Sequence, residues 1–359
     1  MKRLLIALAL LLPLIACEDE IKKGRSGSQT GPDEPETPVV PIPQPESAPA
    51  FAYGADISWV TEMESKGYKF YTSAGAETEC TALMKAIGCN AVRYRVWVNP
   101  TGGWCNKADV LAKAKRAAAL GLAIMIDFHY SDTWADPAHQ DPPAAWASMN
   151  VSQMATAVSN HTKEVLQALK TAKIDVAWVQ VGNETNTGMC LPNGAVSSTD
   201  VSGFKALADA GYDAVKSVYP DAYVILHHSN AHDLNGNKWF YNLVKNVKYD
   251  MIGLSLYPSY WDNGAYPDWT TKTYAAVTNF STLHETYSKP VMLVEFGMPV
   301  SEPANAKAAL QYVLDNTKDF DWFKVVFYWE PESESARNGY DYGAFNNGKP
   351  TIALDPFKK

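Results

Sequence analysis

Two glutamates each stand at the polar end of a short apolar run, where a charged residue is not needed to complete a strand. Glu184 ends a run that begins at Val176, and Glu295 follows Val291-Met-Leu-Val. Such runs are typical of parallel strands buried on both faces, and an ionised side chain there costs desolvation energy. Two carboxylates that face each other across a cleft can hydrolyse a glycosidic bond. We therefore predict that Glu184 and Glu295 are the catalytic residues of a glycosidase.

Two arginines lie near this pair in the predicted sheet. Arg93 and Arg95 are two positions apart on one strand, so their side chains point to the same face. A nearby arginine favours the ionised form of a carboxylate, which the attacking carboxylate of a retaining hydrolase requires. Arg95 is nearer the rim, and we expect it to orient Glu295.

Three further residues are placed to assist. Asn183 is expected to hydrogen-bond the sugar 2-hydroxyl, Tyr257 to hold the nucleophile, and Trp329 to floor the subsite that carries the bond to be cut. Taken singly, a glutamate at a strand end is more often a structural ion-pair or hydrogen-bond partner. The histidines His129, His227 and His228 are more often hydrogen-bonding barrel residues than metal ligands, and their spacing alone does not support a metal hydrolase. The combination is the argument for a catalytic site.

Eight apolar segments alternate with helical patterns along the chain. The segments are Tyr53–Ser58, Ala91–Val98, Ala123–His129, Val176–Glu184, Tyr223–Ser229, Met251–Tyr257, Val291–Gly297 and Val325–Glu330. Candidate helices between them include Glu79–Ile87, Lys107–Ala119, Met154–Thr171, Gly203–Val218 and Ala306–Asp315. Eight strand–helix repeats with right-handed crossovers predict an α/β fold, a closed (β/α)8 TIM barrel that forms a single catalytic domain. A doubly wound open sheet is the alternative, disfavoured because no glycine-rich phosphate loop follows the first strand.

Polar residues gather at the carboxyl ends of these segments, which is where barrel enzymes place their sites. They are Asp56, Ser58, Arg93, Arg95, Trp97, Asp127, His129, Asn183, Glu184, His227, His228, Asn230, Tyr257, Glu295, Trp329 and Glu330. Chance would place polar residues at both ends, so the asymmetry indicates a catalytic barrel.

The first residues predict export. Met-Lys-Arg and an apolar run to Ala16 form a signal peptide over residues 1–16, too short to span a membrane. Leu14-Ile-Ala-Cys17 resembles a bacterial lipobox, which predicts lipidation of Cys17; an ordinary signal peptide is the alternative. Residues 17–49 are rich in Pro, Glu and Ser and predict a disordered tether, and residues 50–359 form the glycosidase domain. We expect the protein to be anchored through lipid at the bacterial outer membrane, at the cell surface.

Charge and cysteine content limit the partners. The net charge is −8, and the sequence contains no basic cluster of the kind that binds nucleic acid, so we expect no nucleic-acid partner. We expect a polysaccharide substrate, a monomer, and no membrane contact except through the lipid anchor. The cysteine spacings match no metal motif, and export permits disulfides. Cys105 and Cys190 both fall in loops at the same predicted rim, and we consider them a candidate disulfide.

Several segments together resemble one family. They are Gly54-Ala-Asp-Ile-Ser58, Val92-Arg-Tyr-Arg-Val-Trp-Val-Asn-Pro100, Asp127-Phe-His-Tyr-Ser-Asp-Thr-Trp-Ala-Asp-Pro137, Gln180-Val-Gly-Asn-Glu184, His227-His228, Glu295 and Tyr328-Trp-Glu-Pro331. The chain from Tyr53 to Phe357 resembles the arabinogalactan endo-β-1,4-galactanases, glycoside hydrolase family 53, within the clan of retaining barrel glycosidases.

The resemblance implies hydrolysis of internal β-1,4-galactosyl bonds in pectic galactan with retention, by double displacement, with Glu184 as acid/base and Glu295 as nucleophile. It places the loop from Tyr130 to Pro143 along the sugar groove. The residues expected to bind substrate are Asp56, Arg93, His129, Asp132, Trp134, Asp136, His227, His228 and Trp329. The chemistry requires no cofactor.

One departure concerns calcium. Some bacterial members carry a long acidic loop after the seventh strand that holds a calcium ion, whereas only Met298-Pro-Val-Ser-Glu-Pro-Ala-Asn-Ala306 follows that strand here. Asp341 and Asn346 in the last loop could bind a hard cation instead, although acidic loops are usually only solvated.

Two other functions remain open from the sequence. A β-mannanase or β-glucanase would use the same barrel and mechanism on a different polysaccharide. A surface glycan-binding lipoprotein without turnover would suit the anchor and tether equally well, but binding alone does not need two apposed carboxylates.

Overall fold

The computed structural model describes residues 48–260 and 268–358. The predicted signal peptide, the lipidation site Cys17 and the tether up to residue 47 lie outside the described residues. Within the described ranges, no helix has both the length and the apolar character needed to cross a bilayer.

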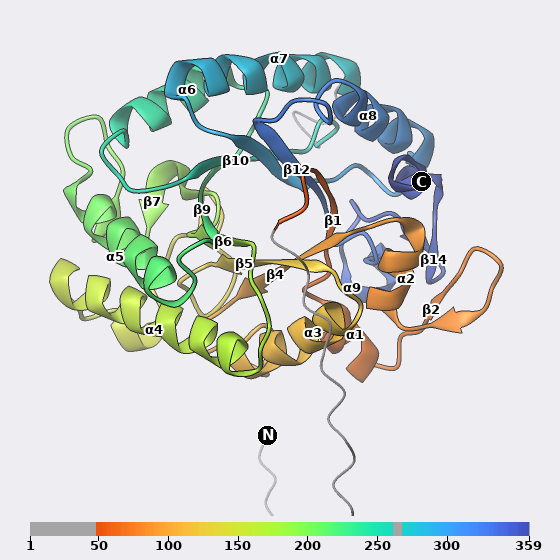
Figure 1. The fold of residues 1–359 in the computed structure, drawn as a ribbon, viewed down its shortest axis with the longest axis horizontal. Helices are drawn as coiled ribbons and strands as arrows, with labels where there is room; N and C mark the ends of the chain where they lie inside the picture. Colours follow the sequence, from red (N-terminus) through yellow and green to blue (C-terminus); the bar gives the residue numbers. More distant parts are fainter. Residues whose placement is uncertain (1–47, 261–267, 359) are drawn as a thin grey trace, which may run out of the picture. The chain divides into compact units, whose positions relative to one another are not determined.

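Eight parallel strands close into a barrel, which confirms the predicted (β/α)8 fold and excludes the open doubly wound sheet (Figure 1). In chain order they are β1 (Ala52–Asp56), β4 (Ala91–Val96), β5 (Ala123–Phe128), β6 (Trp178–Val181), β9 (Tyr223–His228), β10 (Met251–Leu256), β11 (Val291–Phe296) and β12 (Phe323–Trp329). Each strand pairs with the next, and β12 returns to β1 with Asp56 opposite Trp329. The carboxyl ends of all eight strands therefore meet at one face.

Helices follow the strands and surround the barrel (Figure 1). They are α1 (Val60–Ser65), α2 (Cys80–Ile87), α3 (Lys107–Ala119), α4 (Val151–Thr171), α5 (Ser202–Val218), α6 (Leu234–Leu243), α7 (Trp269–Tyr287), α8 (Pro303–Asp315) and α9 (Ser335–Asn338). Short 3-10 turns are η1 (Ala144–Trp146), η2 (Thr185–Thr187) and η3 (Ile352–Phe357). Three two-stranded pairs lie in the loops: β2 (Phe70–Tyr71) with β3 (Glu77–Thr78), β7 (Gly188–Met189) with β8 (Gly194–Ala195), and β13 (Phe345–Asn346) with β14 (Lys349–Pro350).

Capping residues set helix starts that differ from the predicted ones. Helix α4 begins before the predicted Met154 because the Asn150 side chain accepts a hydrogen bond from the Gln153 backbone N–H (3.0 Å) and so caps the first turn. Glu79 is the N-cap of α2 and not its first helical residue, since its carboxylate accepts from the Ala82 backbone N–H (2.8 Å).

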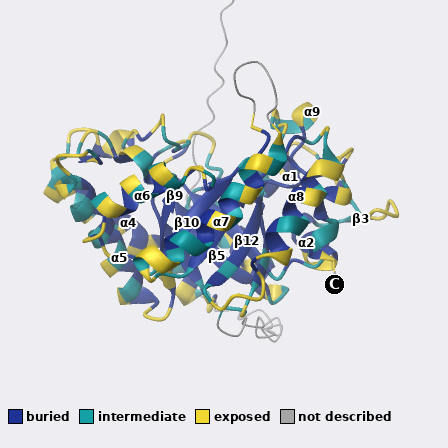
Figure 2. Ribbon diagram, turned by 90° about the horizontal axis from the view of Figure 1, so that it is seen from above, coloured by how far each residue is buried: buried dark blue, intermediate teal, exposed yellow. Residues whose placement is uncertain are grey.

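Alternating side chains produce two apolar layers. Inward-facing residues fill the barrel interior, and Gly54 leaves room there for the Phe327 ring, which an added Cβ would meet at 2.2 Å. Outward-facing residues pack against the helices, and Figure 2 shows the buried strands enclosed by helices whose outer faces are exposed. The interior is therefore a packed core, and only the polar residues at its carboxyl end remain available for chemistry.

Candidate active site

Glu295 lies near the end of β11 and is held at both carboxylate oxygens. Arg93 Nη2 donates to Oε1 (2.9 Å), and the Tyr257 hydroxyl donates to Oε2 (2.8 Å). The Glu295 side chain is only 6% exposed. The predicted contact between Tyr257 and Glu295 is present, and the carboxylate is fixed in one orientation.

The expectation that Arg95 orients Glu295 is wrong, because Arg93 makes that contact. Arg95 Nη1 donates instead to Glu330, which follows β12 on the other side of β1. The Arg95 guanidinium also lies over the rings of Trp59, Trp97 and Trp134, at 4.9, 5.2 and 4.3 Å from their centroids. Glu330 neutralises Arg95 near the rim, and the deeper Arg93 is left to reach Glu295.

Arg93 is the centre of a buried polar network. Its Nη1 donates to Asp56 Oδ2 (2.7 Å), and its Nη2 also contacts Asp127 Oδ2 (2.8 Å), Asn183 Oδ1 (3.0 Å) and Gln180 Oε1 (3.3 Å). Asp56 and Arg93 are both 0% exposed. We predicted both as substrate contacts, and the structure corrects this, because protein groups surround them and they support the carboxylates from below.

Glu184 follows β6 in a left-handed conformation, with φ 41° and ψ 56°. Its backbone N–H donates to His227 Nδ1 (3.1 Å), so this nitrogen accepts and the other ring nitrogen carries the proton toward Ser255 Oγ (2.7 Å). Ser255 in turn lowers the pKa of Glu184, against the effect of burial. Burial lowers the pKa of His227 well below its usual value, so the imidazole is neutral in this contact.

The two glutamates differ in their electrostatic surroundings. Burial, and then the charge of Glu295, raise the pKa of Glu184 to about 8. Burial raises the pKa of Glu295 to about 7, while Arg93 and the Tyr257 hydroxyl act against this rise. A proton shared by the pair therefore resides on Glu184, which leaves Glu295 ionised.

Asn183 directly precedes Glu184 and shares Arg93 with Glu295. Its Oδ1 accepts hydrogen bonds from Arg93 and Gln180 (2.9 Å), and its Nδ2 donates to the Ala135 carbonyl (2.8 Å). An amide nitrogen carries two hydrogens, so one N–H of Asn183 remains for a ligand, as its predicted role at a sugar hydroxyl requires.

The three histidines occupy different layers. His129 Nε2 contacts Asp127 (3.0 Å), and its Nδ1 accepts from the Trp97 indole N–H (3.2 Å). His228 is a correction: alternation along β9 turns it outward, where it packs against Phe240 of α6 at 4.8 Å, so it is not a sugar contact. His227, 0% exposed, supports Glu184 and does not itself line the cleft.

The loop after β5 brings the remaining predicted residues to the rim. Asp132 accepts from the Asn99 (2.8 Å) and Ala144 (2.9 Å) backbone N–H groups and thereby fixes the loop. Asp136 pairs with His139 (2.8 Å). Trp134 and Trp329 meet edge to face at 5.9 Å, and both contact Trp59, so the three rings form one aromatic wall.

Residues 52–351 match the model of glycosyl hydrolase family 53. The chain belongs to this family. The predicted resemblance is therefore confirmed, and the protein is a glycoside hydrolase with Glu184 and Glu295 at the carboxyl face of its barrel.

Several of the similar proteins are named as galactanases. An arabinogalactan endo-β-1,4-galactanase of Thermothelomyces thermophilus is 33% identical over 258 residues, which cover 70% of this chain and 75% of the relative. A probable arabinogalactan endo-β-1,4-galactanase A of Neosartorya fischeri is 35% identical over 304 residues, covering 77% and 83%. The structure of a fungal β-1,4-galactanase matches with a TM-score of 0.76 and 29% identity, over 85% of this chain and 98% of that one. The family 53 catalytic domain of Ignisphaera aggregans shares the fold, with a TM-score of 0.73 at 24% identity.

Sequence reasoning missed several residues that take part in the polar and aromatic contacts described above. They are Gln180, Ser255, Glu330 as the partner of Arg95, and Trp59. Gln180 could have been found, because it is two positions from the inward-facing Trp178 and so must also face the barrel interior.

The proposed disulfide is wrong. Cys105 and Cys190 are both free and buried, and their thiols have different partners: Cys105 Sγ lies 3.7 Å from the Ser58 carbonyl, and Cys190 Sγ lies 3.3 Å from the Tyr130 carbonyl. The loops do meet at one rim, but they place the two sulfur atoms in separate packing environments.

The described residues give no support for a calcium site. In ranges 48–260 and 268–358, no group of three or more His, Cys, Asp or Glu side chains is arranged to hold a metal ion. The Asp341 carbonyl accepts from the Val300 backbone N–H (2.7 Å), and Asn346 lies in the β13–β14 hairpin.

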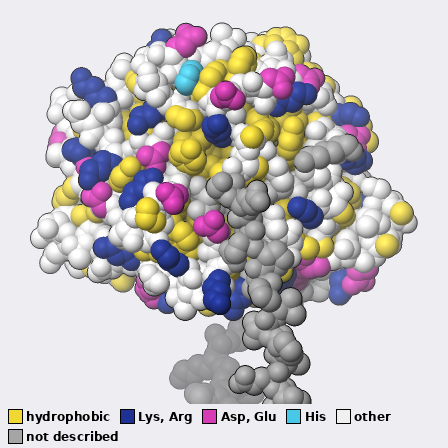
Figure 3. Space-filling model, viewed as in Figure 1, with side chains coloured by type: hydrophobic (Ala, Val, Ile, Leu, Met, Phe, Trp, Pro, Cys, Tyr) yellow, Lys and Arg dark blue, Asp and Glu magenta, His cyan; other side chains and the backbone are white. Residues whose placement is uncertain are grey.

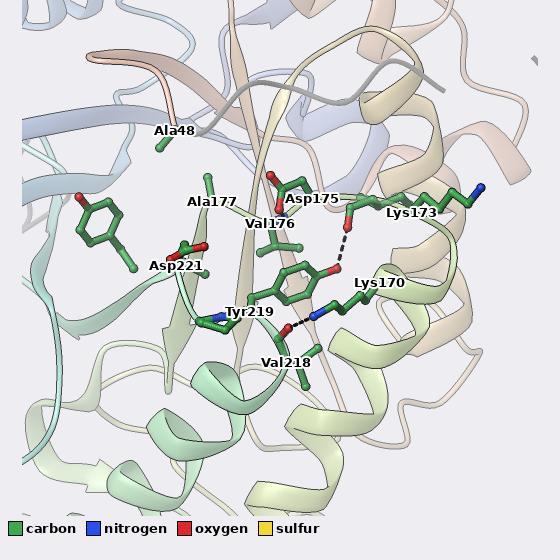
Figure 4. Close-up of a pocket in the computed structure, with 13 residues that line it drawn as sticks. Ala48, Lys170, Lys173, Asp175, Val176, Ala177, Val218, Tyr219 and Asp221 are labelled. Atoms are coloured by element: carbon green, nitrogen blue, oxygen red, sulfur yellow. Dashed lines mark hydrogen bonds between the residues drawn. The ribbon is translucent and has the colours of Figure 1, made fainter. Parts of the chain in front are cut away.

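A surface pocket lies at the opposite end of the barrel, where β6 and β9 begin (Figure 4). Its lining includes Lys170, Asp175 and Tyr219, whose hydroxyl donates to the Ile174 carbonyl (2.6 Å). Since Glu184 and Glu295 lie at the carboxyl ends of the strands, this pocket is not part of the catalytic site.

On the face viewed in Figure 3, basic and acidic side chains are interspersed, without a large surface of one sign.

Proposed function

We propose that this family 53 hydrolase cleaves internal β-1,4-galactosidic bonds of galactan, as its similarity to arabinogalactan endo-β-1,4-galactanases suggests. The observation that carries the mechanism is the paired setting of Glu184 and Glu295, one able to keep a proton and the other held ionised by Arg93 and Tyr257. Two such carboxylates support a retaining double displacement.

In the first step, Glu295 attacks the anomeric carbon, and Glu184 gives its proton to the departing glycosidic oxygen as that bond breaks. The Glu295 carboxylate becomes an ester and loses its charge. Because that charge raises the pKa of Glu184, the pKa falls once the ester has formed.

In the second step, Glu184 acts as the base. It takes a proton from water, which attacks the anomeric carbon and releases Glu295 with overall retention. Arg93 remains balanced throughout by Asp56 and Asp127, so its charge is not left unpaired when Glu295 is esterified.

A time course on linear β-1,4-galactan tests the proposal. We expect the wild type to release mixed oligosaccharides early, and Glu295→Ala to lose nearly all turnover while still retarding in a galactan-containing gel. Cleavage of mannan or β-glucan in place of galactan would reassign the substrate. Retardation by a wild type that releases no product would indicate a binding protein.

We further propose that Cys17 anchors a monomeric enzyme through lipid at the outer membrane, on the cell surface. The lipobox-like Leu14–Cys17 sequence and the Pro-rich tether support this placement, because a tether lets an anchored domain reach a polymer that cannot enter the cell. We expect Cys17→Ser to move the protein from the membrane fraction to the soluble fraction, without change in its activity. A variant that stays with the membrane would contradict lipidation at Cys17.

A further inference from the structure

Glu184 is held in a backbone conformation that is unfavourable for a residue with a side chain. Its φ of 41° lies in the left-handed region, which persists only where surrounding contacts impose it. Hydrogen bonds with three residues hold the two peptide groups on either side of its Cα. His227 accepts from the Glu184 N–H (3.1 Å), Asn186 N–H donates to the Glu184 carbonyl (2.8 Å), and the third partner is Gln140.

Gln140 is buried, at 3% exposure, and its amide nitrogen faces backbone carbonyls. Nε2 lies 2.8 Å from the carbonyl of Asn183, 3.3 Å from that of Glu184 and 3.1 Å from that of Asp136. Only the NH2 end of the amide can satisfy carbonyl oxygens, so these acceptors fix the orientation of the side chain. One side chain thus clamps the carbonyls on both sides of the Glu184 Cα.

The same side chain connects the acid/base to the loop after β5. Gln140 follows Trp134 and Asp136 in this loop, and its own carbonyl accepts from the Leu191 backbone N–H (2.7 Å). Among the described residues, the Gln140 side chain donates its hydrogen bonds to backbone carbonyls and makes none to the carboxyl group of Glu184 or Glu295. Any effect on the chemistry must therefore pass through the position of Glu184.

We propose that Gln140 is a positioning residue for proton transfer by Glu184. By fixing the left-handed turn, it aims the Glu184 carboxyl at the glycosidic oxygen that departs from the anomeric carbon. The inference rests on the proposed hydrolase function. It adds a residue that affects only the two proton transfers made by Glu184, to the leaving group in the first step and from water in the second. Attack by Glu295, which Arg93 and Tyr257 hold independently, is not affected.

This division gives a test that a merely structural role would not satisfy. Galactan needs a proton on its leaving group, whereas a 2,4-dinitrophenyl β-galactotrioside does not, because dinitrophenolate leaves unaided. For both substrates, kcat/KM reports the first step. We expect Gln140→Leu to lower kcat/KM on galactan by about 10- to 100-fold, which is part of the roughly 100- to 10,000-fold that positioned acid catalysis supplies. On the dinitrophenyl substrate we expect a change of less than about threefold, and azide, which needs no base, should raise its kcat.

A matched control is Gln311→Leu, the same substitution on the outer face of α8, where Gln311 pairs only with Asp315 (2.9 Å) among the described residues. It should leave both substrates at wild-type values. Equal losses on both substrates in Gln140→Leu, or no loss on galactan, would overturn the inference. A wild type inert on both substrates would overturn the proposed function, and the inference with it.

Gln140→Glu keeps the test decisive if the leucine variant does not fold. An ionised carboxylate facing three carbonyls repels them, but a protonated one donates a hydrogen bond. The galactan kcat/KM of this variant, relative to wild type, should therefore recover as the pH falls, while the ratio for the dinitrophenyl substrate stays flat. A ratio on galactan that does not change with pH would count against the clamp.

Discussion

The hydrogen bond from Tyr257 to Glu295 sets the lower pH limit of activity in a way that one substitution can test. Tyr257→Phe removes the hydroxyl that lies 2.8 Å from Glu295 Oε2 and leaves the ring in place. This hydrogen bond lowers the pKa of Glu295, opposing burial, which raises it. Its loss must raise that pKa further. Because the nucleophile has to be ionised, the acidic limb of the pH–activity profile should move to higher pH.

The size of the shift follows from the contact. A hydrogen bond to a charged group contributes about 1.5–3 kcal/mol, and one pKa unit corresponds to about 1.4 kcal/mol. The expected rise in the pKa of Glu295 is therefore about one to two units. Tyr257 is half-buried, so water can replace part of the lost interaction, and we expect the lower value of about one pH unit. Burial and the charge of Glu295 raise the pKa of Tyr257 well above its usual value, so the hydroxyl keeps its proton over this pH range.

The assay is kcat/KM on galactan as a function of pH. The loss should be largest, near tenfold, on the acidic side, and the alkaline limb, which reports Glu184, should move much less. Tyr274→Phe is the control, since Tyr274 is 47% exposed on α7 and its ring packs on Tyr312 of α8 (4.3 Å). An acidic limb that stays in place, or moves to lower pH, would refute the assignment of Tyr257 to the nucleophile.

Two further predictions concern stability. Arg93→Met leaves Asp56, Asp127 and Glu295 without their shared cation; we expect the free energy of unfolding, measured in urea at pH 8, to fall by about 3–5 kcal/mol, the cost of breaking a buried ion pair. This loss of stability relative to wild type should be smaller at pH 5. In the wild type, Arg93 and His129 hold the pKa of Asp127 low against burial. In the variant, the unpaired carboxyls have raised pKa values, so they take up protons as the pH falls and the folded state gains stability. A deficit that grows on acidification would contradict this account. Because Cys105 and Cys190 are free and buried, a reductant should leave the thermal unfolding midpoint unchanged within about 1 °C, and a fall of several degrees would indicate a disulfide.

The sequence predicted those parts of the fold that depend on local pattern. The apolar runs identified all eight barrel strands, and their polar ends identified Glu184, Glu295, Asn183 and Tyr257 at one face. These inferences need only the strand period and the rule that parallel strands share a carboxyl edge. Neither depends on which residue contacts which.

Partner choice was the part that the sequence could not supply. Arg93 and Arg95 share a face, and which one reaches Glu295 depends on Glu330, a residue on the far side of β1 that captures Arg95. The error at His228 is of another kind, because strand alternation, which can be read from the sequence, already turns it away from His227 and toward α6. The predicted disulfide between Cys105 and Cys190 was wrong for the same reason as the predicted contact of Arg95. Two loops at one rim do not necessarily bring two sulfur atoms within bonding distance.

The sharing of Arg93 explains how one carboxylate can both attack and leave. A guanidinium 2.9 Å from a buried carboxylate would by itself lower the pKa of Glu295, but Asp127 and Asp56 bind the same cation and raise it. Burial is the largest cause that raises this pKa, so with the two aspartates it ends above the usual value, although each carboxylate oxygen accepts a hydrogen bond. A carboxylate that alone received the whole positive charge of an arginine would be a weak nucleophile. Because Asp56 and Asp127 share the charge of Arg93, Glu295 stays ionised but remains basic enough to form a bond with the anomeric carbon. Asp56 and Asp127 thus influence the reaction without contacting the sugar.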